Sequence, residues 1–390
     1  YIDNVGRISE IISSTDSVAG DDLYLSIDAD LQKATYLALQ NEIAAIVYSN
    51  IKSGEIPIND VYTALIGNSV INTEHFSKAK ASDTEKNVLS VFKSRQKTTL
   101  GKIKQELTSS PEALNTMSDE VLDEFTYIIS MLKDDQVLLK NEIDTSDSVY
   151  QKWKNQKISP KEYLSYCITQ HWIDISQLNV DEKYADSTEV YDALCKYILK
   201  NIKTDTEFSK IIYQYMITRG EISPRQLCLI LFDQGVLDYD DATVNKLKNG
   251  SLSPRDFLMK KIYNIEITPA QLALEPCTGS CVVTDEKTGE ILAMVSYPGY
   301  DSNKLANGVD SEYFASLQHD KSSPLLNYAT QQKTAPGSTF KLVSATAGLV
   351  ENVITTSDQI RCTGIYNDIS NKPKCWIYPG SHGLDNVFEA

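Results

Sequence analysis

Long apolar runs are missing from this chain of 390 residues. No stretch of about eighteen consecutive apolar residues occurs that could cross a bilayer, and no signal peptide opens the chain. Positive charge is also scarce, because 37 lysines and arginines stand against 53 aspartates and glutamates, for a formal net charge of −16. This balance argues against nucleic acid or a polybasic membrane contact as partners. With 42% hydrophobic residues the chain is globular, and its length suggests about two or three domains.

Closely spaced metal ligands are missing as well. The seven cysteines are spread over positions 167, 195, 228, 277, 281, 362 and 375, and the four histidines over 75, 171, 319 and 382. Zinc sites normally show tighter pairs, so we expect buried free thiols. A Cys362–Cys375 disulfide stays open as an alternative outside the reducing cytosol. His382, a lone histidine beside a glycine, is interpreted as structural.

The clearest chemical signal lies between Pro336 and Val350. Pro336 and Gly337 interrupt what precedes them, and the mostly apolar or small residues that follow predict a buried helix beginning near Ser338. Ser338 and Lys341 are three residues apart and share one face of the first turn. A lysine that loses its proton, favoured by desolvation and by the positive helix end, can activate a serine, and free N–H groups there can hold an oxyanion. Ser338 is therefore the predicted nucleophile and Lys341 its base.

The Ser-x-x-Lys pattern alone carries little weight, since the chain contains it at least six times. The other copies lie in polar, charge-rich surroundings, where a solvated helix face is the better interpretation: Ser49/Lys52, Ser77/Lys80, Ser90/Lys93, Ser94/Lys97 and Ser130/Lys133. For Ser338 the competing interpretation is a simple helix N-cap.

Secondary structure changes character along the chain. Leu23 to Ile27 alternates like a short strand, and a helix capped by Asp28 or Asp30 should follow and run through Ile43. From about 43 to 275 the apolar residues keep a helical period, which predicts an all-α segment. A Ser-Pro or Thr-Pro pair recurs there as a helix-starting device, with the hydroxyl as N-cap and proline in the first turn: Ser159-Pro160, Ser223-Pro224, Ser253-Pro254 and Thr268-Pro269.

Strand signals return after Pro276. Residues 281–284 and 291–295 flank a turn and predict a β-hairpin with Gly289 at positive φ. Residues 297–337 predict a long loop with short helical pieces. The Lys287-Thr288-Gly289 sequence inside the hairpin turn matches a box found in serine transpeptidases, but it precedes the serine and lies in a turn, so we interpret it as a coincidence.

Four stretches, in this order, resemble one family. They are Tyr24 to Gln32, Asp285 to Ser296, Leu326 to Lys341 with its Pro-Gly-Ser-Thr-Phe-Lys core, and His382-Gly383. The sequence thereby resembles the class B penicillin-binding proteins, monofunctional peptidoglycan D,D-transpeptidases of the bacterial cell wall, in a clostridial-type form with a large helical insertion.

The resemblance implies an α+β fold, a partial penicillin-binding transpeptidase domain of β-lactamase-like type interrupted by a large all-α insertion. Residues 1–20 would be the tail of an N-terminal non-catalytic region, 21–42 the first part of the transpeptidase domain, 43–275 the insertion and 276–390 the second part. An insertion must leave and re-enter at nearby points, so residues near 42 and 276 should be close in space. The expected Ser-x-Asn and later Lys-Thr-Gly elements do not follow Lys341, so we expect a truncated and inactive fragment of an active enzyme.

The implied reaction is acyl transfer from D-Ala-D-Ala stem peptides through Ser338, and β-lactams would acylate the same serine. The resemblance implies no metal and no organic cofactor. The protein would work at the outer face of the bacterial cell membrane, with its anchor outside this sequence. Two alternatives stay open: a serine β-lactamase or D,D-carboxypeptidase, and a non-catalytic module that docks other wall-assembly proteins through the helical insertion.

Overall fold

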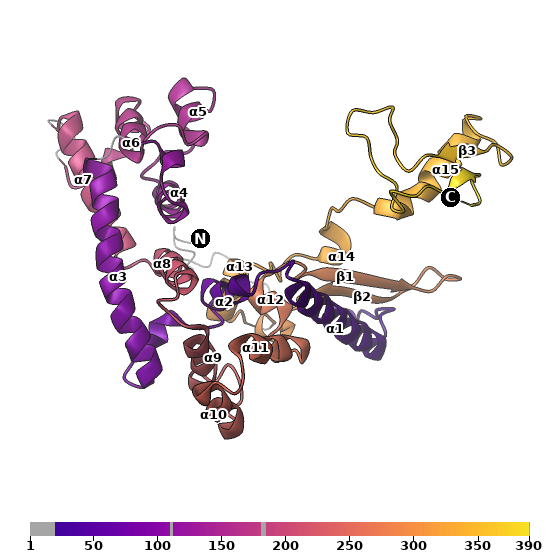
Figure 1. The fold of residues 1–390 in the computed structure, drawn as a ribbon, viewed down its shortest axis with the longest axis horizontal. Helices are drawn as coiled ribbons and strands as arrows, with labels where there is room; N and C mark the ends of the chain where they lie inside the picture. Colours follow the sequence, from indigo (N-terminus) through magenta and orange to yellow (C-terminus); the bar gives the residue numbers. More distant parts are fainter. Residues whose placement is uncertain (1–19, 110–111, 181–184, 307, 390) are drawn as a thin grey trace. The chain divides into compact units, whose positions relative to one another are not determined.

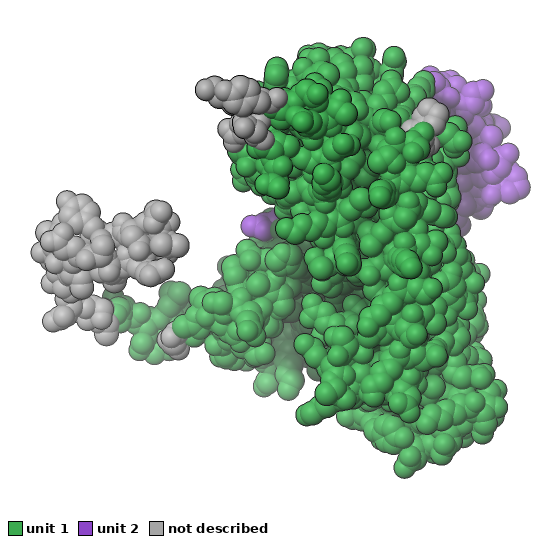
Figure 2. All heavy atoms as spheres, turned by 90° about the vertical axis from the view of Figure 1, so that its left-hand side faces the viewer, with its two compact units in different colours: residues 1–330 green, residues 331–390 purple. Residues whose placement is uncertain are grey.

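The computed structural model describes residues 20–109, 112–180, 185–306 and 308–389. It divides into two compact units, residues 1–330 and 331–390, coloured separately in Figure 2 and described separately here. The expected tail of a preceding region, residues 1–20, lies outside the described residues except for Gly20.

Unit 1 consists of helices and one hairpin (Figure 1). Its described elements are α1 (Ala29–Ser53), α2 (Ile58–Gly67), η1 (Thr73–Ser77), α3 (Asp83–Thr108), η2 (Leu114–Thr116), α4 (Asp119–Asp134), α5 (Ser148–Lys154), α6 (Pro160–Thr169), η3 (Ile175–Gln177), α7 (Ser187–Ile202), α8 (Thr206–Thr218), α9 (Pro224–Asp233), α10 (Asp241–Asn249), α11 (Pro254–Tyr263), α12 (Pro269–Leu272), β1 (Gly279–Thr284), β2 (Ile291–Tyr297), η4 (Ser302–Lys304), α13 (Ser311–His319) and α14 (Tyr328–Gln331). Unit 2 contains η5 (Gly337–Thr339), α15 (Phe340–Val350), β3 (Ile360–Cys362) and β4 (Gly383–Asp385). None of the helices in the described ranges is both long enough and apolar enough to span a membrane. The predicted α+β class is confirmed.

Helix α1 joins the hairpin to the helical region. The Asp28 carboxylate caps it by accepting from the backbone N–H of Leu31 at 2.8 Å. Near its start, the Gln32 amide donates to the Met294 carbonyl at 2.7 Å and accepts from the Met294 N–H at 2.8 Å. Further along, Val47 and the residues around it enter the helical core. One continuous helix therefore packs on β2 with its first half and on helices with its second.

The chain leaves and re-enters the hairpin layer at neighbouring points. A Cβ placed on Gly279 would lie 3.1 Å from Ile43 Cδ1 and 3.2 Å from Leu39 Cδ1. The predicted closeness of residues near 42 and 276 is therefore confirmed. Between them, the described residues from 58 to 272 hold helices and no strand, apart from a single bridge between Leu138 and Ile173.

The strand predicted for Leu23 to Ile27 does not form. The Ser26 hydroxyl donates to the Ile291 carbonyl at 2.8 Å and the Asp28 N–H to the Leu292 carbonyl at 2.9 Å, without a ladder. Leu23 and Tyr24 are 83% and 90% exposed. Apolar alternation signals a strand only where a neighbouring strand pairs with it over several residues, and the described residues supply no such strand here. The hairpin prediction is confirmed: β1 and β2 pair antiparallel, and Gly289 has φ +77°.

A repeated turn joins the helices of the region from 43 to 275. At Gly220 the backbone becomes left-handed, and two residues later the N–H of buried Ile222 donates to the Met216 carbonyl at 3.3 Å. The same left-handed position followed by a buried Ile or Leu recurs at 69, 235 and 265. Each closes the previous helix in the manner of a Schellman motif. The predicted Ser-Pro and Thr-Pro pairs then start the next helix as N-cap and first residue, at 159, 223, 253 and 268.

Replacing each of two glycines of this region by alanine should change the free energy of unfolding in opposite directions. Gly220 has φ +76° and free space around its Cβ position, so Gly220→Ala should lower the free energy of unfolding by about 1 kcal/mol through backbone strain alone. Gly101 lies inside α3 with equally free space, so Gly101→Ala should raise it by about 0.5–1 kcal/mol. Urea unfolding followed by far-ultraviolet circular dichroism measures both. Equal signs would contradict the assigned backbone conformations.

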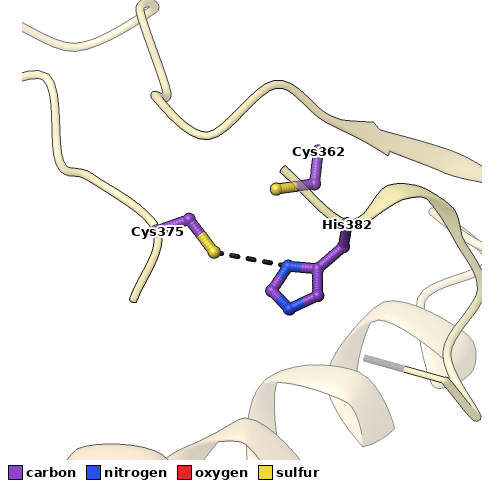
Figure 3. Close-up of side chains that lie close together, drawn as sticks. All are labelled: Cys362, Cys375 and His382. Carbon is purple, nitrogen blue, oxygen red and sulfur yellow. Dashed lines mark hydrogen bonds between the residues drawn. The ribbon is translucent and has the colours of Figure 1, made fainter. Parts of the chain in front are cut away.

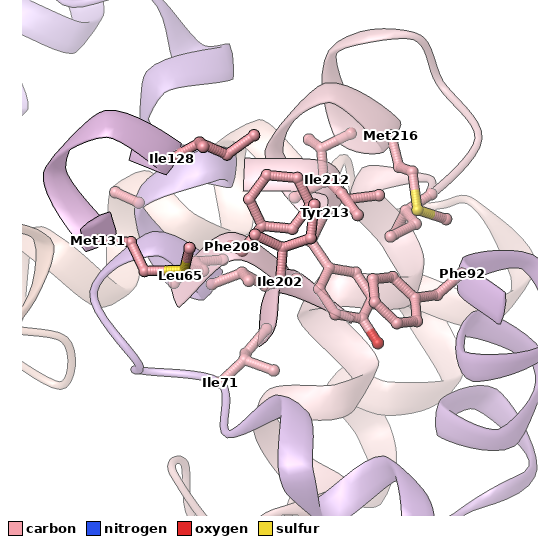
Figure 4. Close-up of a cluster of buried hydrophobic side chains, with 14 of the residues drawn as sticks. Leu65, Ile71, Phe92, Ile128, Met131, Ile202, Phe208, Ile212, Tyr213 and Met216 are labelled. Atoms are coloured by element: carbon pink, nitrogen blue, oxygen red, sulfur yellow. The ribbon is translucent and has the colours of Figure 1, made fainter. Parts of the chain in front are cut away.

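The core of the helical region joins α2, α3, α4, α7 and α8 (Figure 4). The ring of Tyr213 stacks on Phe92 with centroids 4.2 Å apart and meets Phe76 edge-on at 5.9 Å. These contacts join residues more than a hundred positions apart, so the helical region folds as one body around a shared apolar centre.

Buried charges lie beside this core, between α3, α4 and α8. The Glu120 carboxylate is 3% exposed and accepts from Arg95 at 2.9 Å and from Arg219 at 2.6 Å. Glu124, one turn further along α4, is 1% exposed. Burial, with the negative charge of Glu120 adding to it, raises the pKa of Glu124 from 4.5 to about 8.

Glu124 should make the stability of the helical region depend on pH. Because its pKa is higher in the folded than in the unfolded state, the folded protein keeps this proton between pH 4.5 and about 8 while the unfolded chain loses it. Stability should therefore fall by about 1.4 kcal/mol per pH unit across that window from this group. Glu124→Gln should remove that slope. The free energy of unfolding of the variant, relative to that of the wild type, should therefore increase as pH rises. Exposed Glu142→Gln is the control, and parallel profiles for Glu124→Gln and wild type would contradict the prediction.

Candidate active site

Ser338 lies in the short turn that opens α15. It is the middle residue of η5, and α15 begins two residues later at Phe340. Gly337 has φ +58°, a conformation that glycine adopts without strain, and the Thr339 hydroxyl donates to the Pro336 carbonyl at 2.6 Å. Lys341 follows in the first turn of α15, three residues after the serine. The predicted helix is therefore present and begins two residues later than expected.

The expectation that this helix is buried is wrong for the described residues. No residue of α15 is buried, and Leu342 is 77% exposed. Ser338 and Lys341 are also exposed. An apolar helix becomes buried only where other elements cover it, and within unit 2 the described residues leave its apolar side open. Gly348 has a close neighbour in Ile354, because a Cβ added at this glycine would lie 3.0 Å from Ile354 Cγ1.

Unit 2 thus supplies a hydroxyl, an amine one turn away and a helix start, but not a water-excluded environment. Desolvation is what would favour the neutral form of a lysine and strengthen the hold of N–H groups on an oxyanion. The described residues of unit 2 therefore hold the reactive groups of a nucleophilic site, but they do not shield these groups from water.

The earlier Lys-Thr-Gly sequence lies in the turn between β1 and β2. The Asp285 carboxylate accepts from the N–H groups of Lys287 and Thr288, both at 2.8 Å, and from the Thr288 hydroxyl at 3.2 Å. These residues close a hairpin, as the sequence predicted.

A second cluster in unit 2 consists of Cys362, Cys375 and His382 (Figure 3). Their ligand atoms lie within 4.8 Å of one another, and Cys375 Sγ is 3.4 Å from His382 Nδ1. Pairing of β3 with β4 sets Cys362 opposite Gly383, which brings the neighbouring His382 close. Both cysteines are free thiols that line a cavity of about 530 Å³, which Asp358 and Asp385 also line.

Local hydrogen bonds favour the charged form of one thiol. The backbone N–H groups of His382 and Gly364, followed by the His382 ring, lower the pKa of Cys362 to about 7. In contrast, burial raises the pKa of the Cys167 and Cys228 thiols to about 12, which fits the prediction of buried, inert thiols there.

The cluster could hold a zinc ion. Two thiolates and an imidazole are ligands that zinc prefers, and here their ligand atoms lie within 4.8 Å of one another. The same two thiols could instead form the disulfide considered from the sequence, and the two states exclude each other. The signal in the sequence is weak, because 13 and 7 positions separate the three residues. Only the β3–β4 pairing and the loop between these strands bring the dispersed ligands together.

Metal titration of the purified chain tests whether Cys362, Cys375 and His382 bind zinc. Cobalt, a coloured substitute for zinc, should give a thiolate-to-metal charge-transfer band, and Cys375→Ser should weaken zinc binding by at least about tenfold because a ligand is lost. Cys281→Ser, at a half-buried thiol outside the cluster, should leave affinity unchanged. A thiolate band that persists in Cys375→Ser but disappears in Cys281→Ser would place the metal elsewhere.

Comparison with known proteins finds a family that is similar to this region. Residues 279–384 match the penicillin-binding protein transpeptidase domain. This segment is therefore similar to such a domain. The match runs from β1 to β4, includes both Ser338 and Lys341, and confirms the resemblance inferred from the sequence.

Curated relatives agree with the family match. The chain is 31% identical to the peptidoglycan D,D-transpeptidase MrdA of Acinetobacter baumannii over 137 residues, which are 35% of this chain and 20% of that protein. It is 40% identical to MrdA of Escherichia coli K12 over 100 residues, 26% of this chain and 14% of that protein. It is 46% identical to the peptidoglycan D,D-transpeptidase PbpA of Mycolicibacterium smegmatis over 77 residues, 19% and 16%. The chain thus matches no more than a fifth of the length of these three relatives.

Proposed function

We propose that this chain belongs to a peptidoglycan D,D-transpeptidase whose nucleophile is Ser338. The observation that carries the proposal is the transpeptidase-domain match across residues 279–384, which spans the turn that presents Ser338. The names of the relatives, all peptidoglycan D,D-transpeptidases, support the same reaction.

The proposed chemistry is acyl transfer. The Ser338 hydroxyl attacks the penultimate carbonyl of a D-Ala-D-Ala stem peptide while Lys341, in its neutral form, takes the serine proton. D-Alanine leaves with a proton, and an amine of a neighbouring stem peptide then attacks the acyl-enzyme to form the cross-link. A β-lactam acylates the same serine when its strained amide opens. Backbone N–H groups at the start of α15 supply part of the oxyanion hole.

The parts of the chain take different roles in this proposal. Residues 21–42 and 276–390 form portions of the catalytic domain, and 43–275 form an insertion that enters and leaves beside the hairpin. Because α15 and Lys341 are exposed, the 390-residue chain by itself acylates weakly or not at all. The intact enzyme works at the outer face of the bacterial membrane.

The helical region suggests a second function, as a docking module. It holds the extended apolar core of unit 1 and exposes the rings of Tyr239 and Tyr263 at its surface. A region with its own packed core can bind a partner whether or not the serine is active.

Labelling with a fluorescent penicillin tests the enzyme proposal. The full-length protein should form a covalent adduct on the peptide that carries Ser338, identified by mass spectrometry after digestion. Slow release of the label is expected for a transpeptidase, whereas rapid turnover would favour a β-lactamase. A full-length protein that takes up no label would overturn the proposal.

A further inference from the structure

Helix α3 carries a line of lysines on its exposed side. At 100° per residue, Lys86, Lys93, Lys97 and Lys104 all fall within about 20° of one line along the helix, and at 1.5 Å per residue they span about 27 Å. All four side chains are exposed. Helix α3 runs along one side of the helical region in Figure 1. We call these four residues the lysine stripe.

The lysine stripe lacks negative charge of its own. Aspartate and glutamate make up 53 of the 390 residues, yet none occurs from Lys86 to Gln105. Of the ion pairs formed by the described residues, none involves a stripe lysine. Lys93 and Lys97 are four apart, a like-charge spacing that destabilises a helix. A solvated helix normally mixes both signs, so this pattern indicates a surface suited to an anion.

The other exposed residues of α3 narrow the kind of partner. Between and beside the lysines lie small or neutral side chains, among them Ser90, Ser94, Thr98 and Gly101. Specific protein interfaces are anchored by aromatic and large aliphatic side chains, and this face has none exposed. It also lacks the aromatic rings on which nucleic-acid bases stack. Charge is therefore the main attraction that the surface offers.

The surroundings of α3 favour a flexible polymer chain over a flat membrane as the partner of the lysine stripe. Helices α6, α7 and α8 pack against α3 and expose Glu162, Asp192 and Glu207. With a net charge of −16, the chain repels a plane of anionic lipid headgroups, which covers a wide area, through carboxylates such as these. A flexible linear polymer can follow a narrow stripe and avoid them, and its binding gains from released counterions.

We infer that the lysine stripe is a binding surface for a linear phosphate polymer without bases. The inference is independent of Ser338 and of the transpeptidase proposal, since it concerns only the helical region. The helical region would then bind an anionic polymer through α3 and so keep the protein attached to that polymer.

Binding of inorganic polyphosphate to the purified 390-residue chain tests the inference, measured by calorimetry at several salt concentrations. Lys86→Gln, Lys93→Gln, Lys97→Gln and Lys104→Gln are combined in one variant, because glutamine preserves helix propensity. Affinity at low salt should fall at least tenfold, and the slope of log affinity against log salt should flatten by about three, at roughly 0.7 per lost contact. Lys152→Gln, Lys154→Gln, Lys246→Gln and Lys248→Gln combined change the net charge equally at exposed sites elsewhere and should bind within about twofold of wild type.

Three results would overturn the inference. One is equal loss of binding in the two quadruple variants. Another is wild-type binding to polyglutamate or an oligonucleotide that matches or exceeds polyphosphate binding. The third is binding only to vesicles of anionic lipid, which would assign the stripe to a membrane. Circular dichroism and thermal unfolding of both variants exclude loss of folding as the cause.

Discussion

Ser338→Ala in the full-length protein should abolish covalent labelling by penicillin, with a loss of at least about 10³-fold in the acylation rate. The reason is direct, because the serine oxygen forms the acyl bond and alanine offers no nucleophile. Lys341→Met should lower the rate by about 10²–10⁴-fold, since the hydroxyl then lacks a base to take its proton. The measurement is the rate of adduct formation under pseudo-first-order conditions.

Ser344→Ala is the matched control, because this serine lies on the same helix α15 and is also exposed. Labelling should continue at the wild-type rate in that variant. Full labelling of Ser338→Ala, or an adduct mapped to another serine, would rule out the assigned nucleophile. Raising the pH should partly restore acylation in Lys341→Met if the lysine acts as a base, whereas a purely structural role predicts no such recovery.

Glu120→Gln should cost the helical region about 3–5 kcal/mol of unfolding free energy. The carboxylate is 3% exposed and binds both Arg95 and Arg219, so its neutralisation leaves two partly buried guanidinium groups without their counterion. Arg95 cannot compensate fully, because its remaining acidic partner, Glu221, is 3.7 Å away. Urea unfolding followed by far-ultraviolet circular dichroism measures the loss.

Glu207→Gln provides the comparison, since Glu207 is 55% exposed in its pair with Lys210 and should cost under about 1 kcal/mol. Replacing Arg95, Glu120 and Arg219 together by apolar residues of similar size should recover much of the loss, because no charge is then left unpaired. A loss below about 1 kcal/mol in Glu120→Gln would show that water reaches the cluster.

Local patterns in the sequence were sufficient where short-range physics decides structure. The Ser-Pro and Thr-Pro caps at 159, 223, 253 and 268, and Gly289 in the hairpin turn, depend on hydrogen bonds and backbone angles within a few residues. The helix after Ser338 was likewise predictable, because helix formation follows from composition and from the break at Pro336 and Gly337.

Predictions from sequence patterns were wrong where the structure depends on contacts with residues far away in the chain. Leu23 to Ile27 alternates like a strand but stays unpaired, and the apolar α15 stays exposed, because burial and pairing require a partner surface. The cluster of Cys362, Cys375 and His382 was missed for the same reason, since three dispersed positions become neighbours only when β3 pairs with β4.

The sequence by itself determined the family resemblance, the helix starts, the hairpin and the serine and lysine one turn apart, because these depend on residue types at fixed short spacings. Only the tertiary structure decided that α1 serves both the hairpin and the helical core, that two cysteines meet a histidine, and that Glu120 and Glu124 are buried. Those outcomes arise from contacts between residues far apart in the chain, and such contacts leave no local pattern because packing, not spacing, brings their members together.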